Sequence, residues 1–114
     1  MGHIILLGLD IFIFHVFIAV LLLDRGADIN IIGGRFGTAL GSAALMGQLE
    51  VAALLLDRGA DINIIGGRFG TALGSAALMG QQEVAALLLD RGADINIIGD
   101  TFGTALGCVD HVHA

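Results

Sequence analysis

Residues 21–53 read LLLDRGADINIIGGRFGTALGSAALMGQLEVAA, and residues 54–86 repeat this stretch with one change, Leu49 to Gln82. A third copy begins at Leu87 and continues to Gly107, with Asp100 and Thr101 as its substitutions. The copies follow one another without a gap, and this fixed period indicates one supersecondary unit stacked on itself. We therefore expect a solenoid that acts through its surface rather than through a catalytic pocket.

The sequence of each unit predicts two short helices followed by an extended arm. The first helix is predicted over residues 38–46, where Thr38 is a candidate N-cap and the apolar residues follow helical spacing. The second helix is predicted over about 48–58, and Gly59 is placed to supply the left-handed residue that ends it. The Gly66–Gly67 pair then indicates a tight turn within the arm.

The unit resembles the ankyrin repeat. The family's T-P-L-H-x-A-A-x-x-G signature is present as T-A-L-G-S-A-A-L-M-G at residues 38–47. The G-x-x-E-V-V-x-L-L-L-x-x-G-A-D-V-N stretch follows as G-Q-L-E-V-A-A-L-L-L-D-R-G-A-D-I-N at residues 47–63. The resemblance extends from Leu21 to Gly107 and implies a mostly α, ankyrin-type solenoid of helix-turn-helix units with short β-hairpin-like arms.

The chain departs from the family pattern at two positions of the first helix. Alanine replaces the signature proline, and glycine replaces the signature histidine at Gly41, Gly74 and Gly107. Glycine inside a helix costs roughly 0.5–1 kcal/mol relative to alanine. Each unit is therefore expected to be softer than a consensus ankyrin repeat.

The chain divides into an apolar segment at residues 1–20, the repeat array at 21–107 and a divergent end at 108–114. The first segment has the length of a repeat's two helices. From Ile4 to Leu23 every residue is Ile, Leu, Phe or Val, except Gly8, Asp10, His15 and Ala19. It predicts a degenerate first repeat. Two alternatives remain open: a membrane anchor over Ile4–Leu23, which is long enough to span a bilayer, and a surface for self-association.

The other end of the array stops within a unit. Residues 104–114 align with the first helix of a fourth repeat, and no second helix follows them. Solenoids normally need terminal repeats with a polar outer face, and exposed complementary ends make head-to-tail contacts that close into rings or continue into filaments. A homo-oligomer that stacks end to end is therefore one prediction.

Charge and reactive side chains exclude several classes of function. Eleven acidic residues against five arginines give a net charge of −6, which argues against nucleic-acid binding.

The lone Cys108 fits a reducing compartment and so a cytoplasmic or otherwise intracellular location. It stands where the other units have Ser42 and Ser75, and no histidine in the repeats offers itself as a base. The His-x-His pair at 111–113 matches no standard zinc spacing. We expect no enzymatic activity, no metal and no cofactor.

Three Asp-Arg pairs recur at the same place in successive units, at Asp24–Arg25, Asp57–Arg58 and Asp90–Arg91. Adjacent residues do not face each other on a helix, so the members of a pair do not contact each other. The pairs predict solvated edges, where ion pairs between stacked units can form.

The resemblance also implies where a partner binds, because partners of ankyrin-repeat proteins usually meet the arm tips and the first helices along the concave face. The corresponding residues are Ile32, Arg35, Phe36, Ser42 and Met46, then Ile65, Arg68, Phe69, Ser75 and Met79, and in the third copy Ile98, Asp100, Thr101 and Phe102. The three phenylalanines have an alternative role in packing between neighbouring arms. Arg35 and Arg68 are expected to be exposed, where they could meet an acidic partner or Asp100 of another copy.

The sequence thus predicts a non-enzymatic protein–protein interaction module whose partner is an unidentified protein or other copies of the chain. The alternatives are a structural protein that assembles head to tail into filaments, and a repeat fragment anchored to a membrane through Ile4–Leu23.

Overall fold

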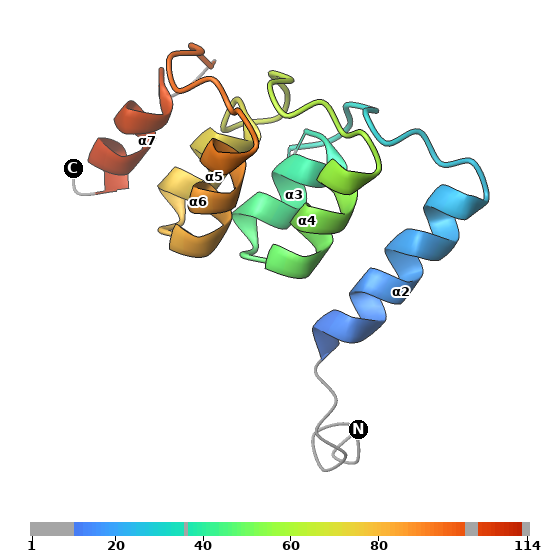
Figure 1. The fold of residues 1–114 in the computed structure, drawn as a ribbon. Coiled ribbons are helices and arrows are strands. Elements are labelled where there is room, and N and C mark those ends of the chain that lie inside the picture. The colour runs from blue at the N-terminus through green and yellow to red at the C-terminus, as the bar shows by residue number, and fades with distance from the viewer. Residues whose placement is uncertain (1–10, 36, 100–102, 113–114) are drawn as a thin grey trace.

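The computed structural model describes residues 11–35, 37–99 and 103–112. Within these residues the helices follow one another across the molecule in chain order, from α2 at one end to α7 at the other (Figure 1). Their bounds are α2 Ile11–Asp24, α3 Ala39–Leu45, α4 Leu49–Asp57, α5 Ala72–Leu78, α6 Gln82–Asp90 and α7 Ala105–Val112. The predicted solenoid of helix-turn-helix units is confirmed.

The first helix of each complete unit begins at its predicted cap. The hydroxyl oxygen of Thr38 accepts a hydrogen bond from the backbone N–H of Gly41 at 3.0 Å. Thr71 does the same for Gly74 at 3.1 Å. These bonds satisfy donors that the first turn of a helix otherwise leaves unpaired. Met46 is the C-cap of α3, so this helix ends one residue before the predicted bound.

The second helices end as predicted, at a left-handed glycine. Gly59 has φ of 91° after α4. Its N–H donates to the carbonyl of Leu56 at 3.1 Å, and the N–H of Ala60 donates to the carbonyl of Leu55 at 2.9 Å. This pair of bonds is a Schellman motif, which satisfies the last carbonyls of a helix.

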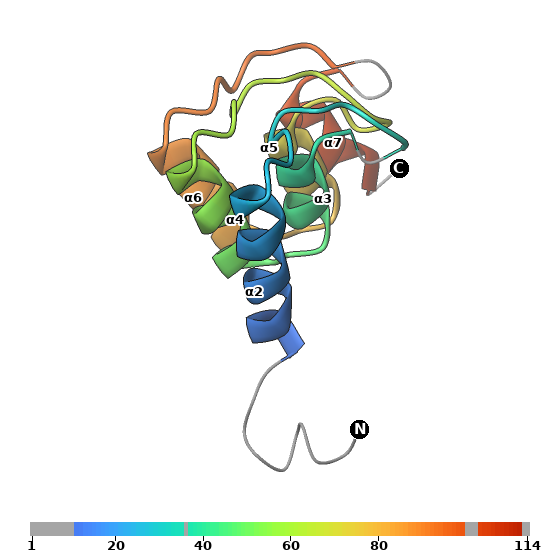
Figure 2. The same ribbon diagram turned by 90° about the vertical axis from the view of Figure 1, so that its right-hand side faces the viewer.

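The core lies between two rows of helices. The row of first helices holds α3, α5 and α7, and the row of second helices holds α2, α4 and α6 (Figures 1 and 2). Leu40 and Leu73 from the first row and Val84 and Leu88 from the second are buried between them. Buried alanines, at positions 43, 44, 52, 72 and 76, allow the helices to approach closely.

The predicted β-hairpin-like arms are not present: the described residues of the arms contain no strand. A backbone hydrogen bond closes each arm near its tip, as from the N–H of Gly66 to the carbonyl of Gly70 at 3.0 Å. Side chains take up other arm donors, since Asp61 Oδ1 accepts from the N–H of Asn63 at 3.0 Å. Aspartate thus binds locally a backbone group that a strand ladder would need.

Glycines let the arms and first helices pack closely. A Cβ atom added at Gly66 would lie 2.9 Å from Ile32 Cγ2 of the preceding arm. A Cβ atom at Gly99 would lie 2.8 Å from the Cα atom of Gly70. At Gly74, which replaces the signature histidine, the added atom would lie 2.6 Å from the carbonyl oxygen of Phe69. This helix glycine is therefore required by the packing of its own unit.

Candidate partner-binding surface

The predicted arm-tip residues recur on one side of the solenoid, where all the arms gather (Figure 2). Ile32, Ile65 and Ile98 hold the same place in successive units, and all three are exposed. Arg35 and Arg68 are exposed beside them, as expected. The arms contact each other, because the N–H of Arg68 donates to the carbonyl of Arg35 at 2.7 Å. The structure therefore brings the repeated arm-tip side chains into one continuous edge.

The predicted first-helix residues differ in accessibility. Met46 and Met79, the C-caps of α3 and α5, are both exposed. Ser42 is half-buried, whereas Ser75 is buried. The difference follows from packing, since α5 has described neighbours on both sides, α3 and α7. Of the two predicted serines, only Ser42 has a partly open side chain.

Of the three phenylalanines in the predicted surface, Phe69 lies within the described residues. Phe69 is half-buried, and the guanidinium carbon of Arg68 lies 5.9 Å from its ring centroid. This geometry fits a cation–π contact, which orients the arginine along the arm. Phe36, Asp100, Thr101 and Phe102 lie outside the described residues.

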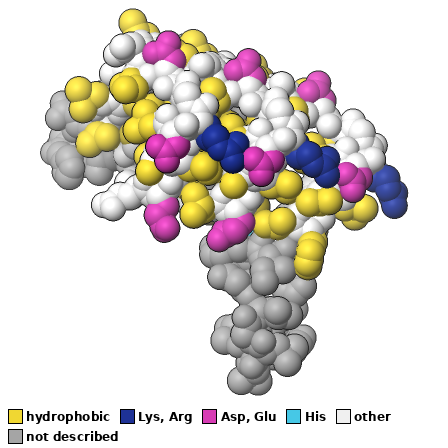
Figure 3. Space-filling model, viewed as in Figure 1, with side chains coloured by type: hydrophobic (Ala, Val, Ile, Leu, Met, Phe, Trp, Pro, Cys, Tyr) yellow, Lys and Arg dark blue, Asp and Glu magenta, His cyan; other side chains and the backbone are white. Residues whose placement is uncertain are grey.

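A row of charged side chains lies at the ends of the second helices. The sequence did not show which aspartate pairs with which arginine. Arg58 Nη2 lies 2.8 Å from Asp24 Oδ1, and Arg91 Nη2 lies 2.8 Å from Asp57 Oδ1. Each arginine thus pairs with the aspartate 34 residues before it. Figure 3 shows acidic and basic side chains alternating along this edge. The ion pairs therefore join neighbouring units. The sequence had predicted solvated edges where such pairs can form.

A second row, of asparagines, was missed by the sequence interpretation. Asn30 Oδ1 accepts from the backbone N–H of Asp61 at 2.8 Å, and Asn63 Oδ1 accepts from that of Asp94 at 2.9 Å. The Asp-x-Asn pattern, which recurs at the same place in each unit, is the signal that could have revealed it. We call the ion pairs and these asparagine bonds together the outer ladder.

The outer ladder has unused groups at both ends. Arg25 and Asp90 are exposed, and neither has an ion-pair partner among the described residues. Asn96 is also exposed, and its side-chain oxygen accepts no hydrogen bond from the part of the chain described. The next rung of the ladder is therefore open at the α6 end.

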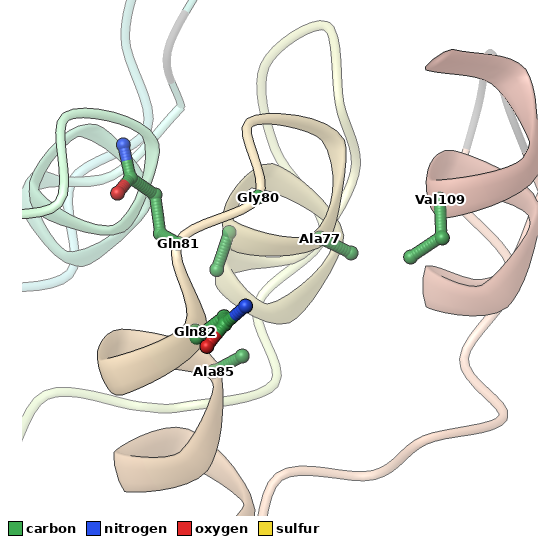
Figure 4. A pocket seen from close by; sticks show the side chains of 7 residues that line it. Ala77, Gly80, Gln81, Gln82, Ala85 and Val109 are labelled. Atoms are coloured by element: carbon green, nitrogen blue, oxygen red, sulfur yellow. The ribbon is translucent and has the colours of Figure 1, made fainter. Parts of the chain in front are cut away.

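A hollow of about 230 Å³ lies between α5, the beginning of α6 and α7. Its walls come from α5, α6 and the turn between them, with Val109 of α7 facing Ala77 and Ala85 across it (Figure 4). The lining is almost wholly apolar. Val109 and Leu106 of α7 are exposed, although the matching residues of α5, Ala76 and Leu73, are buried.

The remaining predictions concern chemistry and the membrane. Cys108 is buried, and burial raises the pKa of its thiol above the ordinary value. Among the described residues no group of three His, Cys, Asp or Glu side chains could hold a metal ion. His113 and the part of the apolar run before Ile11 lie outside them. Of the helices described, none is long and apolar enough to cross a membrane.

Comparison with known families gives one match. The family model for ankyrin repeats, in three copies, matches residues 15–98, a range that takes in most of α2 and all of α3 to α6. A search among curated proteins found no significant match. Ankyrin repeats are protein–protein interaction modules and are typically non-enzymatic. Because the match covers well over half of the 114 residues, and the helices repeat with the same period, the chain belongs to the ankyrin-repeat family.

Proposed function

We propose that this chain binds a protein partner along the arm tips and first helices. The observation that carries the proposal is the recurrence of exposed apolar side chains at the same places in successive units, on the arms at Ile32, Ile65 and Ile98 and at the helix ends at Met46 and Met79. Soluble proteins seldom expose apolar side chains in contiguous sets without a binding role. Methionine suits such a role because its side chain adapts to irregular surfaces.

The charge beside these residues restricts the chemistry of the partner. Arg35 and Arg68 are exposed on successive arms, and they form no ion pair within the described residues. Arginine binds carboxylates with two parallel hydrogen bonds. The surface therefore suits an extended partner whose apolar side chains alternate with acidic ones at the spacing of the units.

The test compares an arm variant with a matched variant elsewhere. Ile65→Asp places a charge in the middle of the proposed surface, and Leu89→Asp places the same charge on α6, at a residue that is also 45% exposed. The wild-type chain and both variants are immobilised, and the proteins that each retains from a cell lysate are identified by mass spectrometry. A retained protein is then purified, and its dissociation constant is measured by calorimetry.

The proposal expects a partner that the wild-type chain and Leu89→Asp bind equally and that Ile65→Asp binds at least tenfold more weakly, because the central contacts dominate an interface. A partner that tolerates Ile65→Asp but loses binding to Leu89→Asp would place the interface on the second helices instead. Circular dichroism of both variants establishes that each remains folded.

A second candidate function is head-to-tail association of the chain with itself. The observation that favours it is the outer ladder, whose end groups Arg25 and Asp90 are complementary in charge and hold the arginine and the aspartate places of the row. A contact between two different surfaces of the same molecule repeats without limit unless it closes into a ring. Light scattering after size exclusion, over a range of concentrations, tests it. A molecular mass that stays at 11.7 kDa throughout would exclude it.

A further inference from the structure

The two ends of the described solenoid lack opposite halves of a helix pair. We propose that α7 of one copy and α2 of the next copy pack together as the first and second helices of one complete unit. This inference rests on the second candidate function, head-to-tail association, and specifies its surfaces and its register.

At the α7 end, no second helix is present among the described residues. Leu73 of α5 is 5% exposed because α6 completes its unit, whereas Leu106, at the same place in α7, is 74% exposed. Val109 is exposed as well, at the place where α5 has the buried Ala76. Val109 also lines the apolar hollow between α7, α5 and α6 (Figure 4). The surface therefore has the position and the chemistry of a seat for a second helix.

The α2 end presents the helix that such a seat requires. Ile18 and Leu22 of α2 hold the places in the repeat that Val51 and Leu55 hold in α4. In α4 these two residues are 8% and 3% exposed, and in α2 they are 53% and 55% exposed. The buried pair in α4 belongs to the core shared with the first helix of its unit. The exposed pair in α2 is therefore the matching face without a described first helix to cover it.

Charge complementarity fixes the register of the contact. Within the chain, each paired arginine meets the aspartate 34 residues before it, as Arg58 meets Asp24 and Arg91 meets Asp57. Asp90 is the next aspartate in this row, and Arg25 occupies the arginine position of its own unit. A copy stacked in register would place its Arg25 against Asp90. Pairs of this kind select partner and register more than they add affinity.

The asparagine row continues across the same contact. Asn30 and Asn63 each accept from the backbone N–H of the aspartate 31 residues later. Asn96 is the next asparagine in the row, and Asp28 of a stacked copy occupies the matching aspartate position. The same register therefore matches the helix seat, the ion pair and the asparagine bond. This match, together with the opposite charges of Arg25 and Asp90, favours a second copy as the occupant.

A charge exchange tests the register. Asp90→Arg and Arg25→Asp each place like charges at the proposed contact, so each variant alone should associate at least tenfold more weakly than the wild type. An equimolar mixture restores opposite charges at every contact and should recover wild-type association. Sedimentation velocity over a concentration series measures the dissociation constants. Glu83→Arg is the matched control, because it changes the charge of α6 by the same amount at an exposed residue outside the row.

A second pair of variants tests the helix seat. Leu106→Asp should weaken association at least tenfold, whereas Ala39→Asp, at an exposed residue of α3 away from both ends, should leave it within twofold of the wild type. Both positions face solvent in the single chain, so neither substitution should unfold it.

The outcomes separate this inference from the function on which it rests. A wild-type chain that remains monomeric at every concentration overturns both. A chain that associates, but whose mixed Asp90→Arg and Arg25→Asp variants recover nothing, overturns the proposed register and leaves self-association standing. Association that is indifferent to Leu106→Asp overturns the proposed helix pair.

Discussion

Helices α5 and α7 begin with the same residues and have very different surroundings. Each follows a threonine cap and starts with Ala-Leu-Gly, at residues 72–74 and 105–107. Yet Leu73 belongs to the core and Leu106 faces solvent. The difference lies in the neighbours, because α5 packs against α3, α6 and α7, whereas α7 packs chiefly against α5. Local sequence thus determines where a helix of this solenoid forms, and adjacent units determine how much it stabilises the fold.

The largest expected effect comes from truncating the same side chain in both helices. Leu73→Ala should lower the free energy of unfolding by about 3 kcal/mol, because it removes buried methyl groups and leaves a cavity. Leu106→Ala should change it by less than about 0.5 kcal/mol, because the side chain is already in water. Urea unfolding, followed by circular dichroism at a concentration where the chain is monomeric, measures both values. Equal losses would show that α7 is as deeply packed as α5.

Equivalent glycines in successive arms can be compared in the same way, because one packs against a preceding arm and the other does not. Gly33 and Gly66 occupy matching places in successive arms, but only Gly66 packs against a preceding arm among the described residues. Gly66→Ala should destabilise the fold by about 1–3 kcal/mol, since the added Cβ atom would press on Ile32. Gly33→Ala meets nothing within 4 Å and should be neutral or stabilise by up to about 1 kcal/mol. Thermal unfolding of the two variants decides the matter, and a destabilised Gly33→Ala would contradict the open geometry of the first arm.

The fold could be predicted from the sequence because its signals are local and repeated. The period, the Thr38 cap and the Gly59 helix stop each depend on a few adjacent residues, and all three are confirmed. The arm strands were predicted wrongly, since the sequence shows a turn but not how the arm's backbone donors are satisfied. In the structure Asp61 and Asn30 accept hydrogen bonds that a strand partner would otherwise accept.

The candidate surface could be predicted only in part. The exposure of Met46 and Met79 at the helix ends follows from their places in the repeat. The burial of Ser75 does not, because Ser42 has the same local sequence and a more open side chain. The outer ladder required knowledge of how units stack, since its partners lie 31 or 34 residues apart. The burial of Ser75 and the outer ladder both depend on adjacent units, so the sequence of one unit does not predict them.

Arg58 forms an ion pair with a neighbouring unit, whereas Arg25 forms none among the described residues. We expect this difference to have a smaller effect on the free energy of unfolding than the leucine and glycine substitutions. Arg58→Gln should lower the free energy of unfolding by about 0.2–1 kcal/mol, because both partners of the Arg58–Asp24 pair are substantially exposed to solvent. The loss should shrink in about 1 M salt, which screens exposed charges. Arg25→Gln, which removes no ion pair within the described residues, should leave the monomer unchanged. A loss for Arg58→Gln that does not respond to salt would assign the effect to packing of its aliphatic stem.

The side of α7 that faces α5 provides the last comparison, because Cys108 is buried there while Val109 beside it is exposed. Burial disfavours the thiolate and raises the pKa of Cys108 in the folded chain above 9.0. As the pH rises past 9, the thiol ionises first in the unfolded chain, so the free energy of unfolding should be constant below that pH and fall above it. The chain contains neither Tyr nor Lys, the other side chains that ordinarily titrate near this pH. Urea unfolding between about pH 7.5 and 10.5 should therefore show a decline that Cys108→Ser abolishes. A decline that persists in Cys108→Ser would mean that the thiol is not the group responsible.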